Sequence, residues 1–296
     1  MIIARVASNL WRKSGTLFSS LPLSKAEIHS AAGANIRASS SIVELRQYQL
    51  HPTQTSVYTQ NTIQLARLHK NLPLAFVGFP ETGAIALNTA VHVYHYPGGH
   101  VERLDKRSAL ASNQEMLKYS GSVNSESSEI FVEAPLVTDF DEITGLKYWV
   151  DNDRSGARRS FDFDIEEHPK DSSNTCIIEL RKYQLKLGYD TVPKFLHIYS
   201  DALPSKLNAN GTHPTTELVS ILVSDVGRLN TVYEVWKHGG EIVGHDTSFC
   251  GLHAMEMSRQ ASRGATEWRN GIMRIAELAM TFDTTILKPL ECSPLR

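Results

Sequence analysis

One nine-residue pattern occurs twice in this chain of 296 residues and constrains the fold more than any other feature. Residues 42–50 read IVELRQYQL and residues 177–185 read IIELRKYQL, with seven identities in nine positions. A second pair of LNT triplets, at 87–89 and 229–231, follows in the same order, and each triplet leads into a β-prone run. Because self-similarity at a regular spacing marks repeated structural units, the sequence predicts two related halves.

Both halves show the same succession of predicted elements. An alternating strand is followed by a helical stretch, a hairpin, a second helical region beyond a Gly-Gly pair, and a last short strand. These segments are 42–50, 57–72, 74–96, 101–120 and 129–133 in the first half, and 177–187, 192–203, 217–237, 253–280 and 282–287 in the second. The turns of the two hairpins are expected at 81–83 and 225–227. This is the β-α-β-β-α-β order of a ferredoxin-like unit, a four-stranded antiparallel sheet covered by helices on one face.

The uncovered face of each sheet needs a partner, and the nearest one is the sheet of the other half. The expected fold is therefore α+β, with two tandem ferredoxin-like units forming a pseudo-twofold dimeric α+β barrel. The halves could pair within one chain or exchange between chains. The expected units are 42–133 and 176–296, and residues 134–175, with Asp/Glu clusters and Gly, Ser and Pro, are predicted to be a linker.

Strand alternation sorts a set of repeated residues onto shared strand faces. In the first half the set is Glu44, Arg46, Tyr48, Asn88, His92 and Tyr94; its counterparts in the second half are Glu179, Arg181, Tyr183, Asn230, Glu234 and Trp236. If these polar faces point between the two sheets, they surround a cavity that could bind a small ligand. The alternative is a structural polar cluster, because removing one member of a buried Glu–Arg pair costs about 3–5 kcal/mol.

Composition argues against nucleic acid as a partner and against a membrane-spanning helix. The chain has 30 Lys and Arg against 32 Asp and Glu, a net charge of −2, and no block of clustered basic residues. Nucleic acid is therefore not expected as a main partner. The longest apolar runs resemble the one at 72–80, far short of the roughly 18–20 residues that a membrane-spanning helix needs, so no transmembrane span is expected.

Cysteine and histidine usage does not indicate a metal site. Cys176, Cys250 and Cys292 are far apart and odd in number, which favours a reducing compartment. His92 and His95 belong to the densest histidine group, but their opposite parity on a strand directs their rings to opposite faces. We expect no metal, no cofactor and no catalytic residue, since GxSxG, P-loop and HExxH motifs are absent from the sequence.

The first 41 residues differ in composition from the rest of the chain. They contain five basic residues, one acidic residue and nine serines, and their apolar residues gather on one side of a helical wheel. This is typical of a transit peptide. Without residues 1–41 the chain would carry 25 basic and 31 acidic residues, a net charge of about −6.

Six segments form a combined pattern across both halves and the C-terminal end: IVELRQYQL at 42–50, LNTAVHVYHY at 87–96, SEIFVEAP at 128–135, IIELRKYQL at 177–185, GRLNTVYEVWKH at 227–238 and ILKPLECSPLR at 286–296. Through these segments the chain resembles the NIPSNAP family of mitochondrial proteins. The resemblance implies the same barrel fold and a mitochondrial location, in the matrix or peripheral to a membrane. It offers no catalytic residues to carry over.

The resemblance also implies a non-enzymatic adaptor in mitochondrial quality control. Animal members of the family look like adaptors that recruit autophagy receptors and related proteins to damaged mitochondria, and an older association is with vesicular transport. Other mitochondrial proteins and a second copy of the chain are further expected partners. The alternative hypothesis is a small-molecule-binding protein or cofactor-free, monooxygenase-like enzyme that uses the polar barrel interior. A haem in that interior would need a proximal histidine, for which His92 is the candidate.

Overall fold

The computed structural model describes residues 41–68, 72–111, 120–134, 176–241 and 248–296. All of them belong to one compact unit, residues 39–296. The predicted transit segment, apart from Ser41, and the predicted linker, apart from Ala134, lie outside the described residues.

The elements follow the predicted order in both halves. The first half contains β1 (Ile42–Leu50), α1 (Thr55–Leu68), β2 (Leu74–Gly83), β3 (Thr89–Tyr96), α2 (Gly99–Ala111) and β4 (Val123–Glu133). The second half contains β5 (Ile177–Leu185), α7 (Thr191–Leu207), β6 (Glu217–Val226), β7 (Thr231–His238), α8 (Gly251–Gly264), α9 (Thr266–Leu278) and β10 (Ala279–Pro289). Two short 3-10 turns, Pro52–Gln54 and Ser120–Ser122, and a small ribbon of β8 (Gly240–Glu241) with β9 (Ser248–Phe249) complete the described elements.

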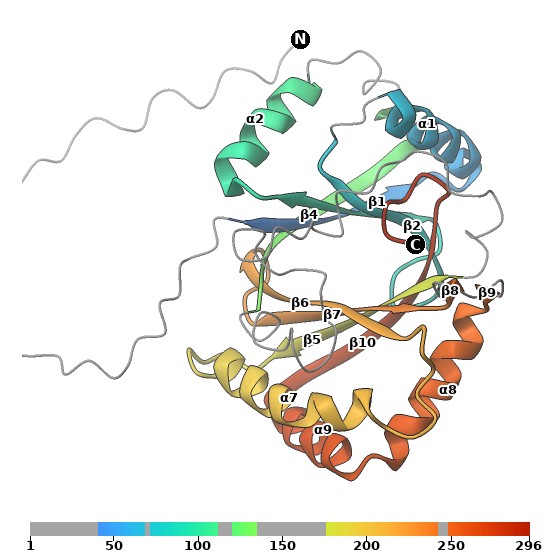
Figure 1. Cartoon of the computed structure of the whole chain (residues 1–296). Coiled ribbons are helices and arrows are strands. Elements are labelled where there is room, and N and C mark those ends of the chain that lie inside the picture. The colour runs from blue at the N-terminus through green and yellow to red at the C-terminus, as the bar shows by residue number, and fades with distance from the viewer. Residues whose placement is uncertain (1–40, 69–71, 112–119, 135–175, 242–247) are drawn as a thin grey trace, which may run out of the picture. The chain divides into compact units, whose positions relative to one another are not determined.

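Eight strands form a closed barrel in the order β1-β3-β2-β10-β5-β7-β6-β4. Within each half the first strand lies between the fourth and the third, as the ferredoxin-like order requires. The halves meet at two equivalent seams, β2 with β10 and β6 with β4, and every neighbouring pair is antiparallel. The predicted α+β barrel fold is therefore confirmed, and both halves of one chain close it. Figure 1 shows α1 and α2 outside one half and α7, α8 and α9 outside the other.

Pairing at the seams explains why the first strand of each hairpin, β2 or β6, continues into the residues where a turn was predicted. A turn was expected at 81–83, but β2 continues through Gly83 because Thr82 and Gly83 pair with Ile286 and Thr285 of the other half. Gly83 has φ +127°, and a Cβ there would lie 2.3 Å from the carbonyl oxygen of Thr284. Only glycine fits this close approach without strain.

The same extension occurs at the second seam. A turn was expected at 225–227, but β6 continues to Val226, which pairs with Ile130 of β4. A further difference is that the helical region expected at 253–280 consists of two helices. They are separated at Ala265, whose backbone is extended with φ −78° and ψ 108°.

The C-terminal tail closes one end of the barrel interior with apolar groups. Leu290 and Leu295 donate backbone hydrogen bonds to the carbonyl oxygens of Val77 and Ala75 on β2, at 2.9 and 3.1 Å. Ser293 accepts one from the backbone N–H of Val77 at 3.1 Å. Leu295 is buried among interior side chains of both halves, where a void of only about 20 Å³ remains. This end of the barrel is therefore a packed core.

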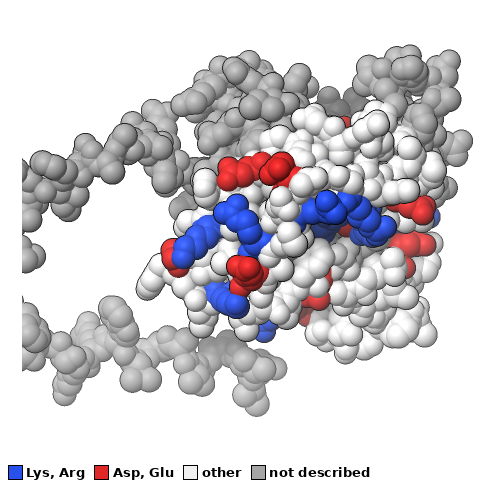
Figure 2. Space-filling model, turned by 90° about the horizontal axis from the view of Figure 1, so that it is seen from below, with Lys and Arg blue, Asp and Glu red and all other residues white. Residues whose placement is uncertain are grey.

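The helices of the second half present charges of both signs to the outside. Figure 2 views the side of α7 and α9, where Lys and Arg form a band with Asp and Glu on either side. Exposed basic residues of α7, α8 and α9 include Lys194, Arg263, Arg269 and Arg274, and exposed acidic ones include Asp201, Glu256, Glu267 and Glu277. Among the described helices, none is long and apolar enough to cross a membrane.

Candidate functional site

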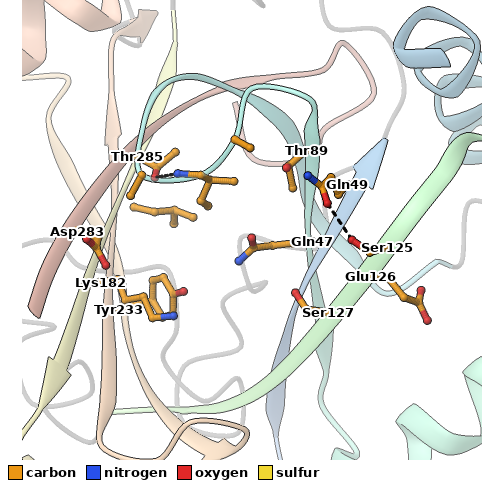
Figure 3. Close-up of a pocket in the computed structure, with 14 residues that line it drawn as sticks. Gln47, Gln49, Thr89, Ser125, Glu126, Ser127, Lys182, Tyr233, Asp283 and Thr285 are labelled. Carbon is orange, nitrogen blue, oxygen red and sulfur yellow. Dashed lines mark hydrogen bonds between the residues drawn. The ribbon is translucent and has the colours of Figure 1, made fainter. Parts of the chain in front are cut away.

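The end of the barrel opposite the tail contains a polar cavity of about 370 Å³. Side chains at every second position of several strands line it, as expected for the inward face of a pleated barrel. The polar residues whose side chains line it are Gln47, Gln49, Thr89, Ser125, Ser127, Lys182, Tyr233, Asp283 and Thr285. Glu126, between Ser125 and Ser127, borders the cavity, but its carboxylate points away from it (Figure 3). Figure 3 shows that β1, β4, β5, β7 and β10 all contribute, so the cavity needs both halves.

The cavity wall offers both hydrogen-bond donors and acceptors. Ser125 donates to the side-chain oxygen of Gln49 at 3.0 Å, and the backbone N–H of Ile85 donates to the Thr285 hydroxyl at 3.2 Å. The ammonium group of Lys182 lies 5.4 Å from the centroid of the Tyr233 ring. The wall thus combines amide and hydroxyl groups with one positive charge, Lys182, and one negative charge, Asp283. Such a lining suits a small polar molecule that is neutral or zwitterionic.

Lys182 and Asp283 are the charged side chains of this wall, and Lys182 has acidic neighbours. Lys182 is 3.7 Å from Glu129, and Asp283 is its cross-strand neighbour on β10. Burial, together with the charges of Glu129 and Asp283, raises the pKa of Tyr233. Tyr233 is therefore a protonated phenol at neutral pH, able to donate a hydrogen bond.

The residues that the sequence places on shared strand faces do not line this cavity. Glu44 contacts Arg103 of α2, His92 contacts Tyr58 of α1, and Glu179 contacts Arg259 of α8. These faces therefore point outward, under the helices, and the condition for the ligand-cavity hypothesis, that they face the barrel interior, is not met. Alternation groups residues on a face but does not say which face the helices cover, and here arginines on the helices reach the carboxylates of the strands.

The first-half cluster is centred on Glu44, which is completely buried. Its carboxylate accepts hydrogen bonds from Arg103 at 2.7 Å, Ser128 at 2.5 Å and Tyr96 at 3.1 Å, and Arg46 lies 3.2 Å away. Burial on its own would raise the pKa of Glu44, but the bonds from Arg103 and Ser128 and the charge of Arg46 lower it overall. The carboxylate is therefore ionised and holds α2 against the sheet.

A group of aromatic rings packs beside this cluster, under α1. The ring nitrogens of His92 lie 3.0 Å from the hydroxyls of Tyr58 and Tyr94, and Tyr48 packs edge-on against His92 with centroids 5.0 Å apart. Arg46 donates to the Tyr48 hydroxyl at 2.6 Å. Burial, with the nearby charge of Arg46, lowers the pKa of His92 to about 3. His92, the candidate haem ligand, thus has both nitrogens against tyrosine hydroxyls and faces away from the barrel cavity.

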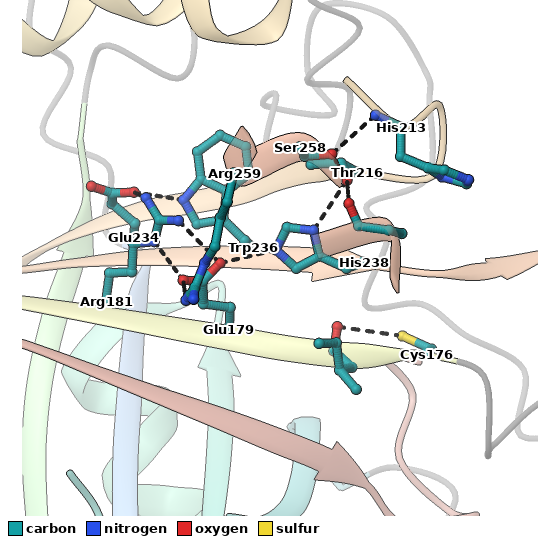
Figure 4. Close-up of polar contacts among 12 residues, drawn as sticks. Cys176, Glu179, Arg181, His213, Thr216, Glu234, Trp236, His238, Ser258 and Arg259 are labelled. Carbon is teal, nitrogen blue, oxygen red and sulfur yellow. Dashed lines mark hydrogen bonds and ion pairs between the residues drawn. The ribbon is translucent and has the colours of Figure 1, made fainter. Parts of the chain in front are cut away.

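The second-half cluster is centred on Glu179, the repeat counterpart of Glu44, and appears in Figure 4. Its carboxylate accepts from Arg181 at 2.7 Å, Arg259 at 2.5 Å and His238 at 3.0 Å. Burial alone would raise the pKa of Glu179, but the His238 hydrogen bond and the charge of Arg181 hold it far below its usual range. Because a carboxylate only accepts, His238 carries a proton on Nε2. Burial lowers the pKa of His238, so the ring is neutral and its Nδ1 accepts from the Thr216 hydroxyl at 3.1 Å.

Glu234 and Trp236 lie beside this cluster on β7. The indole N–H of Trp236 donates to Glu234 at 2.6 Å, and Arg181 is 3.7 Å from the same carboxylate. The side-chain nitrogen of Lys206, on α7, is buried 3.4 Å from the centroid of the Trp236 ring. Burial and the charge of Arg181 lower the pKa of Lys206 well below its usual value. These contacts join α7 to the sheet.

The remaining predicted residues have local structural contacts. Asn88 and Asn230 donate to the carbonyl oxygens of Leu50 and Lys186, at 2.7 and 2.8 Å, and so join each hairpin to the first strand of its half. Tyr183 packs against Phe282 with ring centroids 4.6 Å apart. No group of three or more metal-ligating side chains occurs within the described residues.

Sequence reasoning missed the helix partners of both clusters and the true cavity lining. Arg103 and Arg107 lie one helical turn apart on α2 and therefore on the same face of the helix. This spacing could have indicated that both arginines pair with a carboxylate of the sheet, which is Glu44. The polar positions Gln47 and Lys182 alternate with the selected residues and could have been weighed as the inward face.

The comparisons with known proteins bear on family and fold. No family model matches the chain. The chain is 23% identical over 287 residues to human Protein NipSnap homolog 2, covering 94% of this chain and 84% of that protein. It is 24% identical over 234 residues to the Danio rerio protein of the same name, covering 78% and 66%. The resemblance to NIPSNAP proteins is thereby confirmed.

A solved structure from Fusobacterium nucleatum that carries the name of a monooxygenase has a TM-score of 0.51 to this chain. It is 10% identical, with 84% of this chain and 92% of that chain covered. At this identity the likeness concerns the fold alone, and it agrees with the barrel described above.

Proposed function

We propose that this protein is a non-enzymatic mitochondrial protein of the NIPSNAP type that acts as an adaptor through protein–protein contacts. The observation that carries this proposal is the similarity to human NipSnap homolog 2, which spans 94% of the chain and therefore both halves of the barrel. The transit-like composition of residues 1–41 supports the mitochondrial location. Recruitment of autophagy receptors to damaged mitochondria is the role that we assign to it, with a second role in vesicular transport.

The contacts of the buried charges support a non-enzymatic role. Glu44 is neutralised by arginines of β1 and α2, and Glu179 by arginines of β5 and α8. In both halves these pairs join a helix to the sheet, which is a sufficient physical reason for their presence. We propose that partner proteins contact the outer surfaces of the helices.

Imaging and affinity capture test this function together. We expect a C-terminally tagged full-length chain to reach mitochondria and, after depolarisation, to recruit autophagy receptors. A matched variant without residues 1–41 should stay outside mitochondria. A full-length protein that does not reach mitochondria, or that captures no autophagy factor from depolarised cells, would contradict the adaptor proposal.

A second candidate function is binding of a small polar molecule in the barrel cavity. It is favoured by the volume of about 370 Å³ and by the amide and hydroxyl groups that line it, a size typical of ligand sites. The monooxygenase-like alternative would use the same space. A thermal-shift screen of amino acids and polyols should find one that stabilises the wild type and not Gln47→Leu. If no compound stabilises the protein, the binding hypothesis is wrong.

A further inference from the structure

A second, larger recess lies outside the barrel, on the face of the second half that carries Glu179. We call it the β10 groove: it is bounded by β10, β5, α8 and α9 and has a volume of about 680 Å³. Its floor includes Glu179 and Arg181, and Arg259 stands beside them, as Figure 4 shows. The polar barrel cavity lies on the opposite face of the same strands, so the two recesses are separate.

One wall of the β10 groove is apolar. Trp268, Ile275 and Phe282 line it, and Phe282 is 52% exposed although its ring packs against Tyr183. Met280, which also lines the groove, is 64% exposed. Large apolar side chains exposed along a recess mark a binding surface more often than isolated exposed residues do.

The polar part of the groove is positively charged. Arg181, Arg259 and Arg263 line it, whereas Glu179 is the one carboxylate among its described lining residues. Arg181 and Arg259 both neutralise Glu179, but Arg263 is exposed and has no ion-pair partner among the described residues. A guanidinium of this kind can bind a carboxylate through two hydrogen bonds.

The repeat provides an internal comparison. Phe282 of β10 pairs with Tyr183, and the corresponding pair in the first half is Glu126 of β4 with Tyr48. Glu126 lies 3.8 Å from Arg46, so that position holds a carboxylate paired with the strand arginine. The second half has an aromatic ring there instead. The apolar wall therefore depends on a residue in which the two halves differ.

We propose that the β10 groove binds a single-chain amphipathic anion of the long-chain fatty-acid class. Its carboxylate contacts Arg263 and the accessible edge of Arg259, and its alkyl chain lies against Trp268, Ile275 and Phe282. The groove volume is within the range of roughly 300–1,000 Å³ that ligand sites of this size occupy. The inference does not rest on the adaptor role, and either can fail alone.

Binding of oleate to the purified full-length chain tests this proposal. A fluorescent fatty-acid probe, 11-(dansylamino)undecanoic acid, should bind in a saturable manner with one site per chain and be displaced by oleate. Arg263→Gln should weaken oleate binding about 5- to 10-fold, as expected for losing a charged hydrogen-bond pair. Phe282→Glu, which installs the first-half residue, should weaken it more than tenfold.

Two controls make the test specific. Arg269→Gln changes an exposed arginine of α9 that does not line the groove and should leave oleate affinity unchanged. Oleyl alcohol should bind more weakly than oleate, and Arg263→Gln should not affect it. Absence of saturable probe binding, equal effects of the Arg263 and Arg269 substitutions, or equal affinity for acid and alcohol would each overturn the proposal. Thermal melting of every variant verifies that it is folded.

Discussion

At the scale of single residues, the same glutamate–arginine pair is buried in each half but is completed by different partners. Glu44 is held by two arginines of α2 together with Ser128 and Tyr96, whereas Glu179 is held by Arg259 of α8 and His238. The repeated strand thus provides the carboxylate, and each half has acquired its own donors. This explains why the strand motif is more similar between the halves than the helices are.

Removing the central carboxylate should destabilise the protein strongly. Glu179→Gln removes the main neutralising charge of buried Arg181 and of half-buried Arg259, and leaves Arg181 only its 3.7 Å contact with Glu234. The free energy of unfolding should therefore fall by about 3–5 kcal/mol. Glu126→Gln is the matched control, because that side chain is 57% exposed and its ion pair with Arg46 should contribute about 1 kcal/mol or less. Urea denaturation measures both. A similar small effect for both substitutions would show that Glu179 is not the structural centre described here.

His92 should make the stability of the protein fall as the pH drops below about 6.5. Its pKa is lowered to about 3 in the folded protein, below the usual value of 6.5, so the unfolded chain takes up the proton first. Stability is therefore retained above pH 6.5 and decreases as the pH falls toward 3. Between pH 7 and pH 5 the loss from this residue should be about 2 kcal/mol.

The variant His92→Gln should lack this component of the pH dependence. The free energy of unfolding of wild type and variant is measured in urea at pH 7 and at pH 5. The loss between these pH values in the wild type, minus the loss in the variant, is the contribution of His92. If the two proteins lose the same stability over this interval, His92 is not protonated on unfolding as proposed.

At the scale of elements, the sequence predicts what each segment is more reliably than what it pairs with. The strand 42–50 and the hairpin arms follow from alternation and turn residues, and β1 has the predicted bounds. The extension of β2 through Gly83 does not follow, because it depends on pairing with β10, some 200 residues later. The break at Ala265 was missed although Gly264, the last residue of α8, directly precedes it and glycine commonly marks the end of a helix. Beyond the break, α9 packs against α7.

The C-terminal tail provides a prediction at this scale. Leu295→Ala should lower the free energy of unfolding by about 2–5 kcal/mol, because Leu295 is 3% exposed and fills the apolar end of the barrel. Leu252→Ala on α8 is the control, since that side chain is 44% exposed and should change stability by less than about 0.5 kcal/mol. Thermal or urea unfolding compares them, and an equally small effect at Leu295 would mean that the tail does not close the barrel.

At the scale of the whole molecule, the repeat and the bare face of each predicted sheet were sufficient to predict the barrel. They could not predict the location of its cavity. Both faces of these strands are buried, one by the other half and one by helices, so burial does not distinguish them in the sequence. The ligand-cavity hypothesis depended on Glu44 and Glu179 facing the interior, whereas Gln47 and Lys182 lie there. The glutamates face outward because they pair with arginines of the helices, and these pairs join segments that are far apart in the sequence.

The central claim is that the two halves of a single chain close one barrel at the seams β2–β10 and β6–β4. Val132 of β4 and Val223 of β6 are direct cross-strand neighbours at the second seam. Cysteines at these two positions, in a variant without the native cysteines, can be joined by oxidation and analysed on a non-reducing gel with light scattering. We predict an intrachain cross-link in a species of one chain's mass. Cross-linked dimers would show instead that the halves pair between chains.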